Sequence, residues 1–119
     1  MPTNEEARKF ANGWIAGWNA HDLEEILSHY GEDVELTSPA AARLLQLPSG
    51  SIEGKENLRG YFKKGLEAYP NLKFELLDVL SGVSSVVLYF KNQIGTRTAE
   101  FMEFGEDGKI VRVVANYGA

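Results

Sequence analysis

One residue in the C-terminal third of the chain combines an acidic side chain with apolar neighbours. Glu100 alternates with Thr98 and Met102 along a segment that has the period of two typical of a β-strand. If this face of the strand points inward, burial disfavours the charged carboxylate, and we expect a raised pKa and a group able to donate or accept a proton. The alternative is an outward face, with Glu100 in water and with Ala99 and Phe101 inside.

Two indole side chains stand one helical turn apart near the N-terminus. Trp14 and Trp18 belong to an apolar stripe with the spacing of an amphipathic helix. As parts of a core they need no further role. As the wall of a pocket, they would present indole N–H groups that orient a ligand. Both interpretations hold together if the core encloses a cavity.

The remaining residues that could do chemistry give weaker signals. Ser38 precedes Pro39, a pair typical of the start of a short helix, so its hydroxyl is either a helix cap or a weak catalytic candidate. No serine has the Gly-x-Ser-x-Gly context of a hydrolase nucleophile. His21 and His29 have no partners at the spacing of metal ligands, so we expect no metal site.

Composition restricts the class of protein. The chain has 119 residues, a net charge of −5 and no cysteine. We therefore expect one domain spanning residues 1–119, without disulfides or thiolate zinc sites. The negative charge disfavours nucleic acid, and the apolar runs are too short for a bilayer. The N-terminus shows no secretory signal, although a mature secreted chain could have lost one, and a cytoplasmic location is the expectation.

The pattern of apolar residues predicts an α+β fold. We expect helices at about 4–19, 22–30 and 55–68, a short helix from Ser38-Pro39 to Leu47, and strands at 34–37, 72–81, 84–91, 96–104 and 109–117. Short turns join the last four strands, which therefore form an antiparallel meander. The helices that precede the meander need a sheet face against which to bury their own apolar sides.

The spare apolar surface of the sheet indicates self-association. The strand at 84–91 is apolar on both faces, and helices can cover only one face of a sheet this small. In the last strand, we expect Val111, Val113, Ala115 and Tyr117 to share the apolar face. With no membrane signal, a homodimer that packs through the outer sheet face is the better expectation.

The order of elements and several short segments together resemble the nuclear transport factor two-like superfamily, which includes ketosteroid isomerases and SnoaL-like polyketide cyclases. The resemblance covers nearly the whole chain and is carried by residues 14–23, 30–34, 52–55 and 107–110 and by Tyr117. It implies a cystatin-like α+β roll, in which a strongly curved antiparallel sheet wraps on three N-terminal helices to make a cone with an internal pocket. Members frequently dimerise through the outer sheet face.

The resemblance also assigns positions in a possible site. Ketosteroid isomerases use an aspartate base and an oxyanion hole made by a tyrosine and a protonated aspartic acid. Those positions fall on Ser38, Trp14 and Glu100 here, so that the base and the tyrosine are replaced and only an acid remains. Glu100 is then the candidate acid/base. The expected pocket walls are Trp14, Trp18, Tyr30, Phe62, Met102, Val113 and Tyr117.

Two functions follow as expectations. The first is a pocket for a small apolar ligand, in a binding protein or a cofactor-independent isomerase, cyclase or dehydratase. The second is a non-catalytic ligand-binding or protein-interaction module of the same fold. An open cavity favours the first, and a cone filled by side chains favours the second. The segment 39–50 carries Leu44, Leu45 and Leu47 without an obvious helical partner, and we expect it to form a mobile lid.

Overall fold

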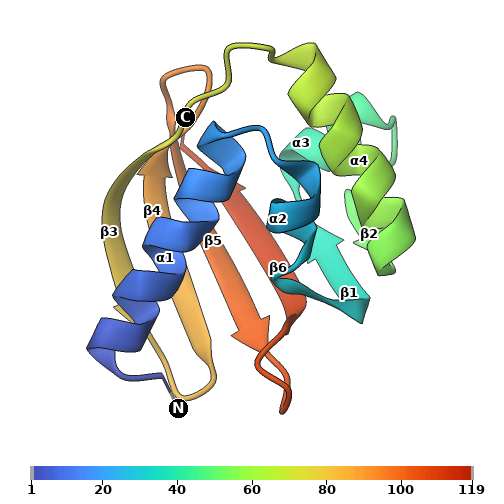
Figure 1. The fold of residues 1–119 in the computed structure, drawn as a ribbon. Helices are drawn as coiled ribbons and strands as arrows, with labels where there is room; N and C mark the ends of the chain where they lie inside the picture. Colours follow the sequence, from blue (N-terminus) through green and yellow to red (C-terminus); the bar gives the residue numbers. More distant parts are fainter. Residues whose placement is uncertain (1, 119) are drawn as a thin grey trace.

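The computed structural model describes residues 2–118, which form four helices and one six-stranded sheet. In chain order (Figure 1), the elements are α1 (Asn4–Asn19), α2 (Leu23–Leu27), β1 (Tyr30–Thr37), α3 (Pro39–Leu44), β2 (Ser51–Glu53), α4 (Lys55–Ala68), β3 (Glu75–Ser81), β4 (Ser85–Lys91), β5 (Arg97–Phe104) and β6 (Ile110–Tyr117). Within this range, no helix has the length and apolar run required to cross a bilayer.

The two long helices have the bounds that the sequence predicts, but the region between them differs. Helix α2 ends at Leu27, and Tyr30, which was predicted to lie on that helix, begins β1 instead. The cause is pairing with another part of the chain, because Tyr30 is in register with Ile110 of β6. Strand β2 was not predicted, since its three residues contain a single buried apolar side chain, Ile52, and are too short for a visible period.

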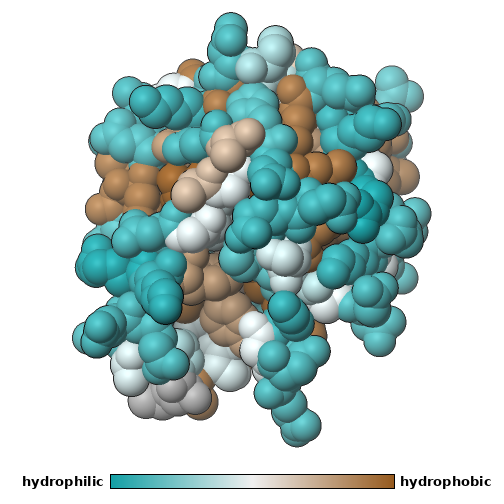
Figure 2. All heavy atoms as spheres, in the orientation of Figure 1, coloured by the Kyte–Doolittle hydropathy of each residue, from teal (hydrophilic) through white to brown (hydrophobic). Residues whose placement is uncertain are grey.

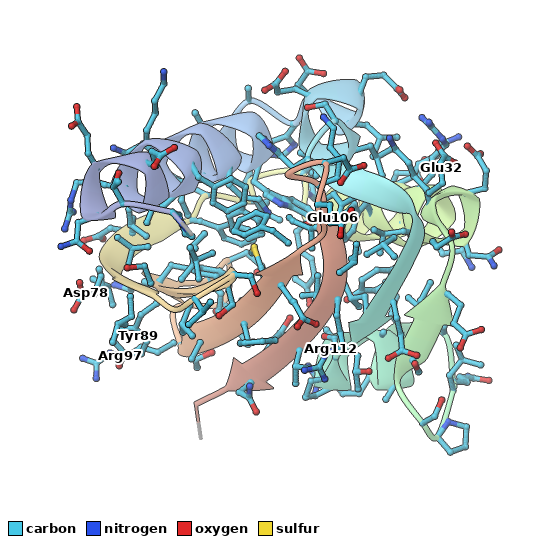
Figure 3. The ribbon with its side chains drawn as sticks, turned by 90° about the horizontal axis from the view of Figure 1, so that it is seen from below. Glu32, Asp78, Tyr89, Arg97, Glu106 and Arg112 are labelled. Carbon is cyan, nitrogen blue, oxygen red and sulfur yellow. The ribbon has the colours of Figure 1, made fainter. Side chains whose placement is uncertain are left out.

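The strands are arranged in the order β2-β1-β6-β5-β4-β3. The last four form the expected antiparallel meander. Strand β1 pairs with β6 in parallel, an arrangement that the sequence did not predict, while β2 pairs with β1 in antiparallel orientation. The sheet is curved and unclosed, and α1 lies across its concave face (Figures 1 and 3).

The core lies between α1 and the concave face of the sheet. Alternate residues of β4, β5 and β6 point into it, and α1 contributes Trp14 and Trp18 from one face. The predicted α+β architecture, a curved sheet wrapped on the N-terminal helices, is confirmed. Hydrophilic side chains cover most of the outer side of the helices, with hydrophobic atoms visible in the gaps between them (Figure 2).

Side-chain hydrogen bonds fix α1 at both ends. At its N-terminus, Thr3 and Glu6 form a capping box, with bonds of 3.0 and 3.1 Å between each backbone N–H and the other residue's side chain. At its C-terminus, the Asn19 side chain donates to the backbone carbonyl of Phe74 at 3.0 Å and accepts from its N–H at 2.7 Å. Helix α1 is therefore tied to the segment that leads into β3.

The prediction that four alternate residues of β6 share its apolar face is wrong at the first of them, Val111. Val113 and Ala115 are buried and Tyr117 is half-buried, as expected, but Val111 is 37% exposed. The pairing of β5 with β6 shifts register between Glu103 and Phe104, and the extra residue turns Val111 away from the core. A bulge of this kind leaves no clear trace in a pattern of apolar residues.

The convex face of the sheet carries an apolar row across four neighbouring strands. The strand register places Leu80, Val87, Phe101 and Val114 side by side. Next to this row, Arg112 pairs with Glu103 at 3.2 Å, and its guanidinium lies 5.3 Å from the centroid of the Phe101 ring. Among the described residues no helix covers this face, which is directed away from α1 (Figure 3).

We predict that the apolar row is the centre of a homodimer interface. Light scattering at tens of micromolar should give a mass of about twice 13.2 kDa. Phe101→Lys should give the monomer, because an unpaired charge in the middle of an apolar interface is strongly unfavourable. Val83→Lys changes a residue that is 76% exposed in the β3–β4 turn and should leave the dimer intact. A monomeric parent protein would contradict the prediction.

Candidate functional site

Glu100 lies in the middle of the concave face. It is in register with Leu88 on β4 and with Ala115 on β6, and both neighbours are buried. Thr98 and Met102 flank it along β5 and are 1% and 0% exposed, while Glu100 itself is 9% exposed. The inward orientation, which the family resemblance implied for this strand face, is confirmed, and the outward alternative is wrong.

This environment keeps the Glu100 carboxyl neutral over a wide pH range. Burial raises its pKa to about 8, because the charged form loses its hydration and nothing in residues 2–118 offsets that loss. The carboxyl group is therefore mostly protonated at neutral pH. A neutral carboxylic acid can donate a hydrogen bond to a carbonyl oxygen, and after ionisation it can accept a proton.

A hydrogen bond between an indole and a phenol ties α1 to the start of β1. Trp14 Nε1 donates to the Tyr30 hydroxyl oxygen over 3.0 Å in the core. Because that bond uses the phenol oxygen as the acceptor, the Tyr30 proton is left for another partner. Burial raises the pKa of Tyr30 well above its ordinary value, and the nearby Glu100 charge raises this pKa further. A phenol is thus present although the family's tyrosine position holds Trp14.

A second group of hydroxyls lies beside Glu100, nearer to the surface. Tyr61 of α4 and Tyr117 of β6 are half-buried, and the pKa of each is raised, first by burial. Two neighbours lower both pKa values: the Ser38 hydroxyl, through a side-chain interaction, and Arg43, through its charge. The charge of Glu100 raises both pKa values. The Arg43 guanidinium lies 6.0 Å from the centroid of the Tyr117 ring.

Ser38 is 3% exposed and caps α3, because its hydroxyl oxygen accepts the Ala40 N–H at 3.1 Å. The interpretation as a helix cap is confirmed. The same hydroxyl lies next to the phenols of Tyr61 and Tyr117. A capping serine in this position can therefore also contact a ligand. A direct part in catalysis stays a prediction.

Aromatic rings fill much of the space between α1, α4 and the sheet. Trp18 and Phe62 meet edge to face with centroids 4.8 Å apart, and Phe74 packs against Phe90 at 4.7 Å. Of the seven predicted pocket walls, six are buried in this core and pack with their neighbours: Trp14, Trp18, Tyr30, Phe62, Met102 and Val113. Their contact with a ligand stays a prediction. Within residues 2–118, the Trp18 N–H has no hydrogen-bond acceptor.

A groove of about 360 Å³ opens between α4 and the segment that contains α3 and β2. Leu45, Leu47 and Ile52 line it together with Tyr61. Tyr61 therefore stands between this groove and the hydroxyls near Glu100. The sequence patterns gave neither Tyr61 nor Arg43 a role in the site, because their proximity to Glu100 depends on how α3 and α4 pack.

A comparison with known protein families identifies the family of this chain. The SnoaL-like domain matches residues 11–113. The chain belongs to the SnoaL-like domain family. A solved structure of a SnoaL-like protein of unknown function from Burkholderia thailandensis is 38% identical over 100% of both chains, with a TM-score of 0.96. No curated protein shows significant sequence similarity.

More distant solved structures share the fold with this SnoaL-like protein. A protein provisionally named as a ketosteroid isomerase from Kribbella flavida is 19% identical, with a TM-score of 0.76 and coverage of 97% of this chain and 79% of that chain. A nuclear transport factor two-like protein of unknown function from Cytophaga hutchinsonii is 15% identical, with a TM-score of 0.73 and coverage of 99% and 95%. The expected superfamily and cystatin-like fold are confirmed.

The raised pKa of Glu100 predicts how the stability of this SnoaL-like protein depends on pH. Its ordinary pKa is 4.5 and its pKa in the folded protein is about 8, so the folded state holds the proton more tightly. The stabilisation of the folded state by this tighter proton binding is fully present below about pH 4.5 and is lost as the pH rises to 8. The free energy of unfolding should fall by at most about 1.4 kcal/mol per pH unit in that window.

Chemical denaturation from pH 5 to 9 measures this slope. Glu100→Gln should remove most of it, because an amide does not ionise. Glu103→Gln is the matched control, since it lies on the same strand and faces outward beside Arg112. If the parent protein and Glu100→Gln had the same pH dependence, the carboxyl would not be desolvated.

Proposed function

We propose that this SnoaL-like protein binds a small, largely apolar molecule on the concave side of its sheet and uses Glu100 as an acid–base group. The observation that supports the proposal most strongly is a carboxyl group held neutral among apolar side chains in the middle of the fold. Pairs of titratable groups with shifted pKa values in an enclosed site are typical of acid–base catalysts.

The chemistry that suits this arrangement is proton transfer next to a carbonyl group, without a cofactor. In the ionised form, the Glu100 carboxylate takes a proton from the carbon beside the carbonyl. The electron pair of that C–H bond forms a C=C bond to the carbonyl carbon, and the π pair of the carbonyl moves to its oxygen. A phenol, Tyr30 or Tyr61, donates a hydrogen bond to that oxygen. Glu100 then returns the proton to another carbon, which gives an isomer, or to a leaving hydroxyl, which gives a dehydration product.

The Kribbella flavida protein is named as a ketosteroid isomerase, which agrees with this reaction class. Its sequence identity to this chain is low and supports a shared fold alone. We propose a homodimer as the working form. The cysteine-free sequence makes the cytoplasm the proposed location. The substrate class that these features support is a small molecule with an apolar body and a carbonyl or hydroxyl group.

A ligand would reach the site past the segment at residues 39–50. Leu44 and Leu47 are 40% and 37% exposed, whereas Leu45 packs against the core. Helix α3 is only six residues long, and an isolated helix of that length is unstable. Movement of this segment, together with Tyr61, would open the groove toward the hydroxyls near Glu100.

We predict that residues 39–50 exchange their amide hydrogens faster than β4, β5 and β6. The physical reason is the small number of hydrogen bonds that hold this segment, compared with the continuous ladders of the meander. Hydrogen–deuterium exchange read out by mass spectrometry measures the difference. Protection equal to that of the meander would exclude a mobile lid.

A second candidate function is a non-catalytic interaction module. The observation that favours it is the dense packing of aromatic rings on the concave side, with Trp14, Phe74 and Phe90 in mutual contact. If those rings leave no room for a ligand, the fold presents only its surface to partners. Binding of a flat ketone at Glu100 distinguishes the two candidates.

We predict that 2-acetylnaphthalene, a flat aromatic ketone, binds to the parent protein and quenches the fluorescence of Trp14 and Trp18. Neutral Glu100 donates a hydrogen bond to the ketone oxygen below about pH 8, and the ionised form repels that oxygen above it. The affinity should therefore fall by about tenfold as the pH rises through 8, which is the expected effect of one buried hydrogen bond.

Glu100→Gln keeps a donor that does not titrate, so this variant should bind the ketone with an affinity that no longer depends on pH. Glu103→Gln should behave like the parent protein. Circular dichroism checks that each variant is folded. A Glu100→Gln variant with the parent's pH profile would mean that the residue does not contact the ligand, and the acid–base proposal would be wrong.

A further inference from the structure

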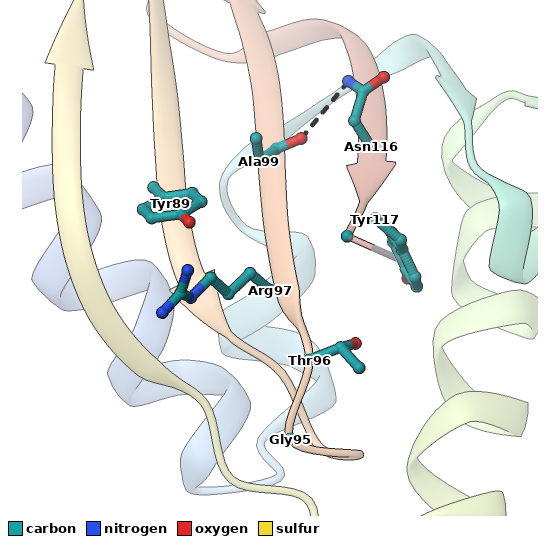
Figure 4. A pocket seen from close by; sticks show the side chains of 8 residues that line it. Tyr89, Gly95, Thr96, Arg97, Ala99, Asn116 and Tyr117 are labelled. Carbon is teal, nitrogen blue, oxygen red and sulfur yellow. Dashed lines mark hydrogen bonds between the residues drawn. The ribbon is translucent and has the colours of Figure 1, made fainter.

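A second hollow of about 600 Å³ lies on the convex side of the sheet, on the opposite side from Glu100. It is found where β4 and β6 end and β5 begins, near the β4–β5 turn (Figure 4). The strand register explains its shape, because Tyr89, Ala99 and Asn116 stand in one row across the three strands. The small Ala99 side chain forms the floor between two larger neighbours.

The end of the hollow lacks side chains. Gly95 and Gly118 line it, and Gly95 has a φ of 84°, which the tight β4–β5 turn requires and which disfavours other residues. The backbone there is held in place, because Gly118 N–H donates to the Arg97 carbonyl at 2.7 Å. The hollow is therefore a consequence of strand pairing and turn geometry rather than of side chains that could easily refill it.

Among the residues that line the hollow, only Arg97 carries a charge, and its guanidinium can only donate hydrogen bonds. Arg97 lies beside Tyr89, and the side chains of Thr96 and Asn116 come from the turn and from β6 (Figure 4). The ring of Tyr117 points away from Arg97. Within residues 2–118, no carboxylate lies within ion-pair distance of Arg97.

The local charge differs from that of the whole protein. The chain has a net charge of −5, yet no acidic residue lines this hollow. Lys91 is in register with Arg97 and adds a second positive charge to that row, which also holds the acidic Glu75 on β3. Asp78 stands opposite Tyr89 in the next row, and its carboxylate accepts a hydrogen bond from the Val79 N–H at 2.8 Å.

We infer that this convex hollow, which we call the Arg97 groove, is a binding site for a small aromatic carboxylate. The planar guanidinium fork of Arg97 suits a carboxylate. The Tyr89 ring gives an aromatic body a surface on which to pack. The volume of the hollow is within the range of small-molecule sites. This inference does not depend on the acid–base proposal for Glu100.

The probes that test it are 2-naphthoate and its neutral counterpart 2-naphthamide, added to the native protein in whatever oligomeric state it has. We expect 2-naphthoate to bind with a dissociation constant below about 1 mM and to shift the NMR amide signals of residues 95–99 and 116–118. The naphthamide should bind about tenfold more weakly, because it lacks the charge that Arg97 recognises. Inorganic phosphate, as a third probe, separates a site for carboxylates from a general anion site.

Three variants locate the interaction. Arg97→Gln should weaken 2-naphthoate binding by about tenfold, and Arg97→Lys should restore part of it, because a lysine offers charge without the planar fork. Ala99→Leu should abolish binding by filling the floor of the groove. Lys9→Gln, on the exposed side of α1, should bind like the parent protein.

Several results would overturn the inference. These are the absence of saturable 2-naphthoate binding at several millimolar, equal binding of acid and amide, or unchanged affinity in both Arg97→Gln and Ala99→Leu. Shifts confined to β1, α4 and the concave face would place the ligand at the Glu100 site instead. Phosphate binding as tight as that of naphthoate would reject an aromatic carboxylate as the specific ligand.

Discussion

The fold depends on covering the concave face of a strongly curved sheet with aromatic side chains. Trp14 and Trp18 supply this cover from α1, and they pack against Phe62 and Phe74 from other elements. Replacing a buried tryptophan by alanine typically costs about 3–5 kcal/mol, a large share of the roughly 5–15 kcal/mol by which a domain is stable. The meander and α1 can therefore hardly be stable without each other.

The same packing explains why Glu100 is informative. A well-packed core gains nothing from a carboxyl group, and hydrophobic replacements of buried ionisable groups are often neutral or stabilising. Local choices that conflict with the rest of a fold tend to be retained at functional sites. The polar groups around Glu100 come from β1, α3, α4 and β6, so that the site exists only when all four are assembled.

Short-range sequence patterns were sufficient to predict much of the fold. The period of two placed Glu100 on one strand face with Thr98 and Met102, the family resemblance turned that face inward, and helical spacing gave the bounds of α1 and α4. Three features were beyond such patterns: the short β2, the change of Tyr30 from helix to strand, and the parallel pairing of β1 with β6. Each depends on a partner far along the chain, and the roles of Tyr61 and Arg43 depend on how separate elements pack.

The parallel pairing of β1 with β6 has a consequence for synthesis on the ribosome. Leu36 lies beside Val113, so one of the first strands to be made has to wait for the last strand. Until residues 110–117 leave the exit tunnel, β1 can pair only with the short β2, and its other edge stays open. Contacts between distant parts of a chain form slowly. Completion of the sheet, with the concave site behind it, therefore has to follow the synthesis of residues 110–117.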